Sequence, residues 1–387
     1  MAWDKSLRLK SLPPYLFSEI DKKKKALFAA GKDVINLGVG DPDQPTPQFI
    51  REAMKAAVEE AAFHRYPLDE GLPEYREAIA RYYKRRWNVT LDPATEIYPV
   101  IGSKEAVFHF PLSVVNPGEA VLIPEPGYPP YRSGTVFADG RPVLMPLRKE
   151  NGFLPDLAGL DAKALEKAKL LWVNYPNNPT GAVASRAWMQ EAVNFAHRHG
   201  LILASDSAYC ETYYEEPPTC LFQLDGGKEC GIEFHSLSKT FNMTGWRIGW
   251  AAGNRELIAA LAAIKSNADS GQFMALQKAS AVALDRGDEE SKKIREMYRR
   301  RRDAFVAAMQ KAGLQAEKMP ATFYQWTPVP GKRTSVEFIT LLLEKAHVVT
   351  TPGNGFGPSG EGYFRVALTQ TEERIREACD RIAKAIG

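Results

Sequence analysis

The chain has 387 residues, of which 44% are hydrophobic and 25% charged, and its 50 basic residues nearly balance 47 acidic ones. This composition is typical of a globular protein, and the net charge of +3 does not indicate a nucleic-acid partner. At roughly 150 residues per domain, the length allows two or three domains. The four cysteines form no C-x-x-C pair and no disulfide framework, so we expect a reducing compartment.

Several functional classes lack their sequence signals. The stretch "MAWDKSLRLK" has no apolar segment of a signal peptide, and no apolar run approaches the roughly 18 residues that cross a membrane. We therefore expect a cytoplasmic protein with no membrane partner. Neither an H-E-x-x-H metal site nor a G-x-S-x-G nucleophile turn is present, so we expect no metal site and no hydrolase chemistry.

The chain order predicts three parts. Residues 1–47 carry little core and two Pro-rich turns, which indicates an arm and a segment that joins the smaller domain. Residues 48–284 alternate helical periodicity, as in "SRAWMQEAVNFAHRHG", with short apolar runs. The runs that predict strands are "EIYPV", "AVLIP", "PVLMPL", "KLLWVNY", "LILASD" and "IEFHS". This alternation predicts a large α/β domain with a mainly parallel sheet flanked by helices.

Residues 285–387 follow a different pattern. A long charged helix, "DEESKKIREMYRRRRDAFVAAMQKAG", precedes the strand-like runs "ATFYQWTPV", "HVVTTPG" and "YFRVAL", and a last helix follows. We expect a smaller α+β domain here.

Lys239 lies in "EFHSLSKTFNMTGWRIGW", in a small-residue turn between two runs that predict buried strands. A lysine is most often a solvated surface charge, because burial of an unpaired ammonium is costly. In a partly apolar site its pKa falls, and a neutral amine is a nucleophile that forms Schiff bases with aldehydes. Lys239 is therefore a candidate catalytic residue.

Active sites of open parallel sheets lie outside the carboxyl ends of the strands. At these positions the sequence has "GSKEA", which opens a helix suited to an anion, "GYPPY" with the ring of Tyr128, "PNNPTG", "DSAY" with Asp206, and "HSLSK". Each motif alone is common in loops. Together they match pyridoxal 5′-phosphate, which needs a Schiff-base lysine, a phosphate cradle, a carboxylate for its ring nitrogen and a stacking ring.

From residue 15 to 387 the chain resembles the pyridoxal-phosphate-dependent aminotransferases of the aspartate-aminotransferase-like group, which have fold type I. The motifs that carry this resemblance are "RYPLDEGLPEYREAIA", "GSKEA", "PGYPPY", "NYPNNPTG", "DSAY", "SLSKTFNMTGWRIGW" and "GYFRVAL". They occur in the family's order and spacing.

The resemblance implies roles around the cofactor ring. Lys239 would bind the cofactor and move a proton at the substrate α-carbon. Asp206 would pair with the ring nitrogen and keep it protonated. Tyr209 and Asn178 would bond the ring hydroxyl, and Tyr128 would stack on the ring.

The resemblance also implies the anion contacts. The phosphate would be bound by the residues Ser103, Lys104, Ser236, Ser238 and Arg247, the last through a fork that bonds two oxygens. Tyr66 would reach the phosphate of a neighbouring subunit, which implies a homodimer with shared sites. Arg365 would hold the substrate α-carboxylate, helped by Gly38 and Asn178; a surface ion pair is the lesser alternative, because this arginine lies inside an apolar strand.

Two further segments resemble the LL-diaminopimelate aminotransferases. They are "LPPYLFSEID", with Tyr15 beside the substrate, and "KSNADSGQF". Diaminopimelate carries an amino acid group at each end, so a site that also admits 2-oxoglutarate must satisfy a distal ammonium and carboxylate. The candidates are Asp69, Glu70, Lys104 and Asn267, for which a wet rim without a specificity role is an equal alternative.

Other functions stay open at this point. Alanine, aspartate, branched-chain and aromatic aminotransferases share the scaffold, although "KSNADSGQF" has no arginine for the distal carboxylate of aspartate. A nicotinamide dehydrogenase is suggested by "GNGFGPSG", but this run lies near the C-terminus and joins no first strand to its helix. A non-catalytic regulator would need a DNA-binding module, which the short N-terminal arm cannot hold.

Overall fold

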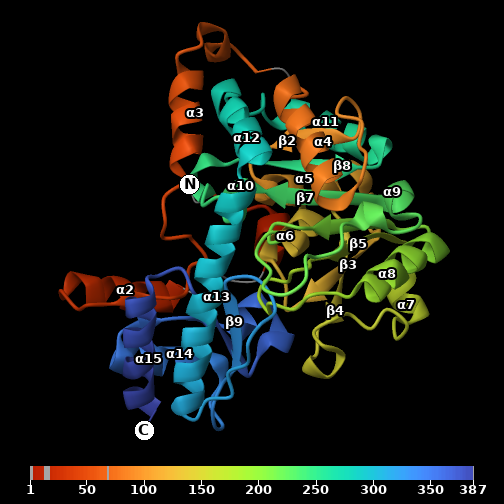
Figure 1. Ribbon diagram of the computed structural model, residues 1–387. Helices are drawn as coiled ribbons and strands as arrows, with labels where there is room; N and C mark the ends of the chain where they lie inside the picture. Colours follow the sequence, from red (N-terminus) through yellow and green to blue (C-terminus); the bar gives the residue numbers. More distant parts are fainter. Residues whose placement is uncertain (1–2, 13–17, 68, 387) are drawn as a thin grey trace.

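The computed structural model describes residues 3–12, 18–67 and 69–386. Its centre is a seven-stranded sheet, here called the large sheet, with the strand order β2-β8-β7-β6-β5-β3-β4 (Figure 1). The strands are β2 Ile97–Val100, β3 Ala120–Glu125, β4 Arg141–Pro146, β5 Ala168–Val173, β6 Ile202–Asp206, β7 Gly231–Ser236 and β8 Gly249–Gly253. Strands β3 to β7 pair in parallel, and only β8 runs antiparallel to its neighbours. The predicted α/β class with a mainly parallel sheet is confirmed.

Helices flank the large sheet (Figure 1). They are α3 Gln48–Val58, α4 Pro73–Trp87, α5 Ser103–Val114, α6 Pro129–Phe137, α7 Ala162–Leu165, α8 Arg186–His199, α9 Gly227–Cys230, α10 Leu237–Thr240, α11 Arg255–Ala268 and α12 Met274–Arg286. Helix α8 coincides with the predicted "SRAWMQEAVNFAHRHG": Ser185 Oγ accepts from Trp188 N at 3.2 Å, and Gly200 ends the helix at a φ of 60°.

Two smaller sheets, here called the small sheets, lie beside the large sheet. Strands β11 Thr351–Pro352, β12 Tyr363–Ala367 and β9 Tyr324–Pro328 are antiparallel, and β1 Ile35–Asn36 pairs in parallel with β10 Val348–Val349. The associated helices are α2 Ser18–Ala29, α13 Asp288–Lys311, α14 Ser335–Leu341 and α15 Glu372–Ile386, whereas α1 Leu7–Ser11 contacts α6 beside the large sheet. The pairing of β1 with β10 brings an N-terminal segment against C-terminal elements. None of the helices in the described ranges is both long and apolar enough to cross a membrane.

The cores of the two parts are separate. One hydrophobic cluster joins Phe305, Phe338 and Phe364 with Ile35 and Leu37, so the N-terminal segment shares the core of the small sheets. Other clusters cover the two faces of the large sheet and contain its fully buried Trp172. The position of the large-sheet strand ends relative to the small sheets therefore depends on contacts between two cores.

Arg301 on α13 binds the segment that joins the two parts. Its guanidinium donates to both carboxylate oxygens of Asp43 at 2.6 and 2.8 Å, and to the Leu368 carbonyl at 3.1 Å. The side chains of Arg301 and Asp43 are only 5% and 16% exposed. Removal of one partner leaves the other charge poorly solvated, which costs more than the loss of an exposed pair.

We predict that Arg301→Ala lowers the midpoint of thermal unfolding by about 5 °C or more, because a buried ion pair is broken on one side. Differential scanning calorimetry of the purified protein measures this shift. Arg299 provides the control on the same helix, because its pair with Glu296 is 49% and 43% exposed and its loss should cost about 0–1 kcal/mol. Equal shifts for Arg301→Ala and Arg299→Ala would contradict the prediction.

Candidate active site

A cavity of about 560 Å³ opens at the carboxyl edge of the large sheet, where it faces β9 and β12. Parallel strands end at the same edge, so residues far apart in the sequence meet there. The predicted site residues that line this cavity are Ser103, Lys104, Tyr128, Asn178, Asp206, Tyr209, Ser236, Ser238, Lys239, Arg247 and Arg365. Gly38 lies next to it, because its carbonyl accepts from Arg365 Nη2 at 2.9 Å.

Lys239 lies on the short helix α10, directly after β7. The predicted turn is one turn of helix in the structure, closed by the bond from Phe241 N–H to the Leu237 carbonyl at 3.1 Å, and Leu237 N–H bonds the Ile248 carbonyl that precedes β8. Lys239 Nζ donates to the Gly40 carbonyl at 2.7 Å. The pKa of Lys239 is lowered to about 8, mainly by burial; Asp41 opposes this shift, and Arg365 and Arg247 add to it. A minor fraction of the amine is therefore neutral near physiological pH, far more than for an ordinary lysine.

Asp206 ends β6 and is 4% exposed. Its carboxylate accepts from Tyr131 Oη at 2.7 Å and from Ala208 N at 3.2 Å. Burial raises the pKa of Asp206, and these two hydrogen bonds only partly offset the effect. Within the described part of the chain no basic side chain forms an ion pair with it. The Asp206 carboxylate could therefore pair with a cation bound in the cavity.

The loop after β5 connects Asp206 with Arg365. Asn174 donates from Nδ2 to the Asp206 carbonyl at 2.7 Å and accepts at Oδ1 from Asn178 N at 2.9 Å. The Asn178 Oδ1 atom in turn accepts from Arg365 Nη1 at 2.9 Å. This chain of hydrogen bonds fixes the Asn178 amide between the large sheet and β12.

An anion cradle forms around the start of α5. Its first N–H groups have no side-chain cap, because the preceding residue is Gly102 in a left-handed conformation with a φ of 70°. A Cβ atom on Gly102 would lie 2.6 Å from Arg247 Nη2, so only glycine lets the guanidinium approach this helix start. Ser236 and Ser238 line the same cavity, and Ser236 Oγ accepts from Ser238 N at 3.2 Å.

Arg365 on β12 is 7% exposed. Its guanidinium carbon lies 4.1 Å from the centroid of the Tyr324 ring and 4.6 Å from that of Phe356. Its Nη1 and Nη2 atoms bond Asn178 and Gly38. Its Nε atom is buried and has no hydrogen-bond partner among the described residues. A fixed arginine with spare donor capacity suits a carboxylate ligand.

Tyr324 on β9 lines the cavity from the side of the small sheets. Its hydroxyl is 2.9 Å from Tyr209 Oη, and it reaches so close to Gly40 that a Cβ atom there would lie 2.0 Å away. Gly40 is therefore required for the approach of Tyr324. The carbonyl of Gly40 also accepts the bond from Lys239.

The structure does not bring all predicted residues to this cavity. Tyr66 is 87% exposed, and Asp69, Glu70 and Asn267 are also exposed and do not line it. The Asn267 amide donates to the Ala263 carbonyl of its own helix at 2.8 Å. Tyr15 lies outside the described residues.

Sequence reasoning missed several residues here, including Gly40 and Asp41. Tyr131 and Asn174 stand inside quoted motifs, and their spacing after Tyr128 and before Asn178 was the available signal. Tyr324 and Phe356 belong to the small sheets, and nothing in their local sequence indicates that they reach the cavity.

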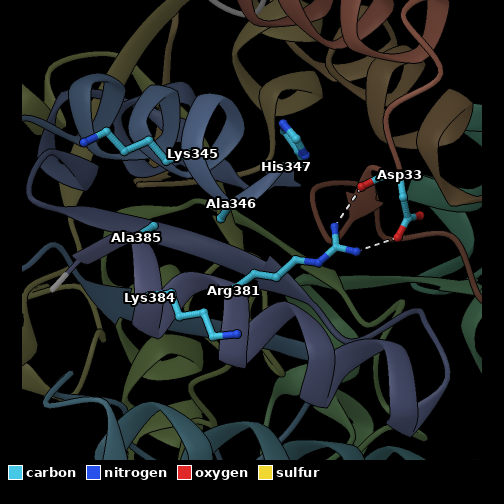
Figure 2. A pocket seen from close by; sticks show the side chains of 7 residues that line it. All are labelled: Asp33, Lys345, Ala346, His347, Arg381, Lys384 and Ala385. Atoms are coloured by element: carbon cyan, nitrogen blue, oxygen red, sulfur yellow. Dashed lines mark hydrogen bonds and ion pairs between the residues drawn. The ribbon is translucent and has the colours of Figure 1, made fainter.

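A second cavity of about 350 Å³ lies on the far side of the small sheets, between α15 and the segment after α14 (Figure 2). It is lined by Asp33, Lys345, Ala346, His347, Arg381, Lys384 and Ala385. Figure 2 shows Arg381 directed at Asp33, whose carbonyl and carboxylate both accept from it. The guanidinium of Arg381 in this second cavity is therefore already paired within the chain. The first cavity is the better candidate for an active site.

The first cavity fits pyridoxal 5′-phosphate. The buried Asp206 carboxylate lacks a cation, the uncapped start of α5 with Arg247 offers donors for a phosphate, and Lys239 supplies an amine of lowered pKa. No group of His, Cys, Asp and Glu that could hold a metal occurs among the described residues.

Comparisons with known proteins agree with this arrangement. The family model described as "Aminotransferase class I and II" matches residues 32–382. The chain is 52% identical to "LL-diaminopimelate aminotransferase" of Aquifex aeolicus (strain VF5), over 97% of both chains. It is 51% identical to the protein of that name from Nitratidesulfovibrio vulgaris (strain DSM 19637 / Miyazaki F), again over 97% of both.

A solved structure shares the whole architecture. The structure described as "Substrate bound BacF structure from Bacillus subtillis" superposes with a TM-score of 0.95 at 40% identity, over 99% of this chain and 98% of that chain. The predicted α/β fold of the aminotransferase type is thereby confirmed.

We predict that the labelling of Lys239 by an amine-reactive reagent, in protein freed of cofactor, rises to half its maximal rate near pH 8. Only the neutral amine reacts, and below its pKa the ammonium does not. Peptide mass spectrometry across a pH series gives the rate at this residue. A midpoint near the ordinary lysine value of 10.5 would show that the site does not lower the pKa.

Proposed function

The chain belongs to the class I and II aminotransferase family, a pyridoxal-phosphate-dependent family, and we propose that it transfers an amino group from LL-diaminopimelate to 2-oxoglutarate, a reaction of lysine biosynthesis. The observation that carries the chemistry is the convergence of Lys239, Asp206 and Arg365 on one cavity. The names of relatives about half identical in sequence support the substrate.

When bound, pyridoxal 5′-phosphate supplies an aldehyde that captures amines and a ring that accepts electrons. We propose that Asp206 stabilises a protonated ring nitrogen, that Tyr209 and Asn178 bond the ring hydroxyl, and that Tyr128 stacks on the ring. The phosphate contacts would come from Ser103, Lys104, Ser236, Ser238 and Arg247.

Lys239 would carry the proton during the reaction. Its pKa of about 8 lies near the working pH, which favours both removal of the proton from the substrate α-carbon and its return. The bond from Nζ to the Gly40 carbonyl would orient the amine.

Arg365 would bind the α-carboxylate of each substrate in turn, because donor and acceptor both carry this group. Its position between Tyr324, Phe356, Gly38 and Asn178 restricts the guanidinium before the ligand arrives, which reduces the entropic cost of binding.

The distal contacts would require a second copy of the chain. Tyr66, Asp69 and Glu70 are exposed on one segment and do not reach the cavity of their own chain, so we propose a homodimer in which this segment serves the partner's site. Burial, and then the charges of Asp269, Asp69, Glu105 and Glu70, raise the pKa of the Tyr98 phenol to about 12. Because Asp269 and Glu105 are paired with Lys265, Asp69 and Glu70 are the proposed contacts for a distal ammonium.

We further propose the predicted domain limits and a cytoplasmic location. The separate hydrophobic cores support a large domain over residues 48–284 and a small domain over residues 285–387 that includes the segment near Ile35. A role in amino acid biosynthesis supports the location.

We predict that Asp206→Asn keeps the cofactor but lowers kcat by about 10²–10³-fold, because an amide cannot stabilise a protonated ring nitrogen as a carboxylate does. Stopped assays and the cofactor's absorption give both quantities. Tyr131→Phe is the matched control, since it removes one hydrogen bond to Asp206 and keeps its charge; its effect should be about tenfold. Activity of Asp206→Asn within a few-fold of the parent enzyme would refute this role.

We predict that LL-diaminopimelate has the highest kcat/KM among amino donors assayed with 2-oxoglutarate. A site built for a distal ammonium leaves buried acceptors unpaired with shorter donors, which should lower kcat/KM by about one to two orders of magnitude. The panel should include alanine, aspartate, glutamate, leucine and phenylalanine. A higher value for any of these five would reassign the protein to a broader alanine-, aspartate- or aromatic-type aminotransferase.

A further inference from the structure

A carboxylate on the large sheet holds a loop of the small sheets across the boundary between them. Glu125 is the last residue of β3 and is 6% exposed. Its Oε1 atom accepts from Ser359 N at 2.8 Å, and its Oε2 atom accepts from Ser359 Oγ. Ser359 lies in the loop 353–360, which contains the short helices η6 Gly353–Phe356 and η7 Pro358–Gly360.

The loop 353–360 is shaped for this contact. Gly357 has a φ of +127°, and a Cβ atom there would lie 2.0 Å from Glu125 Oε1, so a larger residue would displace the carboxylate. The two ends of the loop meet backbone to backbone, because a Cβ atom on Gly353 would lie 2.0 Å from the Gly360 carbonyl oxygen. A second bond crosses the boundary nearby, from Gly127 N to the Phe356 carbonyl at 2.9 Å.

The same loop carries Phe356 into the active site. Phe356 lines the cavity, and its ring centroid lies 4.6 Å from the Arg365 guanidinium carbon and 6.0 Å from the Trp326 ring. On the other side of the boundary, Tyr128 follows Gly127 by one residue. The Glu125 contact therefore joins the segment that positions Tyr128 to the loop that positions Phe356.

We propose that Glu125 is a positioning residue for the reaction: its carboxylate, by accepting both donors of Ser359, holds Phe356 against Arg365 and so keeps Arg365 in place for the substrate α-carboxylate. This role rests on the proposed transamination. Breaking the contact leaves a buried carboxylate with too few donors, so the loop moves away from β3 and Phe356 moves with it.

The role predicts a specific kinetic change. Ser359→Ala removes one donor from an exposed position and keeps the backbone N–H, so the protein should fold normally. It should raise KM for the amino donor and for the 2-oxo acid alike by about tenfold, with kcat changed less than about threefold, because both substrates use the same carboxylate contact before chemistry. The cofactor's absorption should not change. Ser359→Thr, which restores the hydroxyl, should recover the parent KM.

Hydrogen exchange in the substrate-free protein tests the contact itself, whatever reaction the enzyme catalyses. In Ser359→Ala and Glu125→Gln the amides of residues 353–361 should exchange about tenfold faster than in the parent protein. The control is Glu191→Gln, because Arg198 Nη2 bonds Glu191 Oε1 at 2.6 Å in an exposed pair on helix α8; it should change neither exchange nor KM.

Unchanged exchange and unchanged KM in Ser359→Ala would overturn the proposal, as would equal effects from Glu191→Gln. If the parent enzyme transaminated none of the donors while exchange in Ser359→Ala still rose, the proposed function would fail and the Glu125 contact would stand as a structural link alone.

Discussion

An excess of positive charge governs the active site. Lys239, Arg247 and Arg365 line one cavity, and among the described residues that line it Asp41 and Asp206 are the acidic ones. Guanidinium groups stay protonated in proteins, so the lysine is the cation that responds to burial and to its neighbours. The lowered pKa of Lys239 is the result, and it makes the amine a nucleophile. The two arginines then remain as sites for two anions, which matches a ligand pair with a phosphate and a carboxylate.

The order of the strands places these charges. Strands β6 and β7 are parallel neighbours, and Asp206 lies opposite Phe234 in their register. The chain from Ser236 to Lys239 therefore begins just beyond the end of β6, and Asp206 and Lys239 reach the same cavity without a long loop. Arg247 lies two residues before the antiparallel β8, in a left-handed conformation with a φ of 54°. Because the first residue of β8, Gly249, pairs with Val100 at the end of β2, Arg247 lies beside Gly102 and the start of α5. Each of these positions follows from the sheet, so the cofactor side of the site is rigid.

The sequence predicted this rigid side well and the remainder poorly, for physical reasons. Apolar runs bounded by turn residues predicted the strands of the large sheet, and the residues at their ends were found because parallel strands share an edge. Tyr131 escaped notice because a fully buried tyrosine in a helix reads as core until its hydroxyl is seen to bond Asp206. Tyr324 and Phe356 escaped because their approach to the cavity depends on how two cores pack, which no local pattern encodes. Asp69, Glu70 and Asn267 were selected by their charge or amide groups near a motif, and the single chain does not place them at its own cavity.

The two sides of the site therefore differ in how they are held. The residues proposed to bind the cofactor belong to one sheet edge and are fixed by its backbone pairing. The proposed substrate arginine belongs to β12, and its place depends on a few contacts across the boundary: Asn178 with Arg365, Gly127 with Phe356, and Glu125 with Ser359. A change in these contacts alters the position of Arg365, and with it the binding of the substrate α-carboxylate. It leaves Lys239 and Asp206 in place. Substrate choice can thus vary within this architecture at low cost, because the charge arrangement that performs the chemistry does not have to be rebuilt.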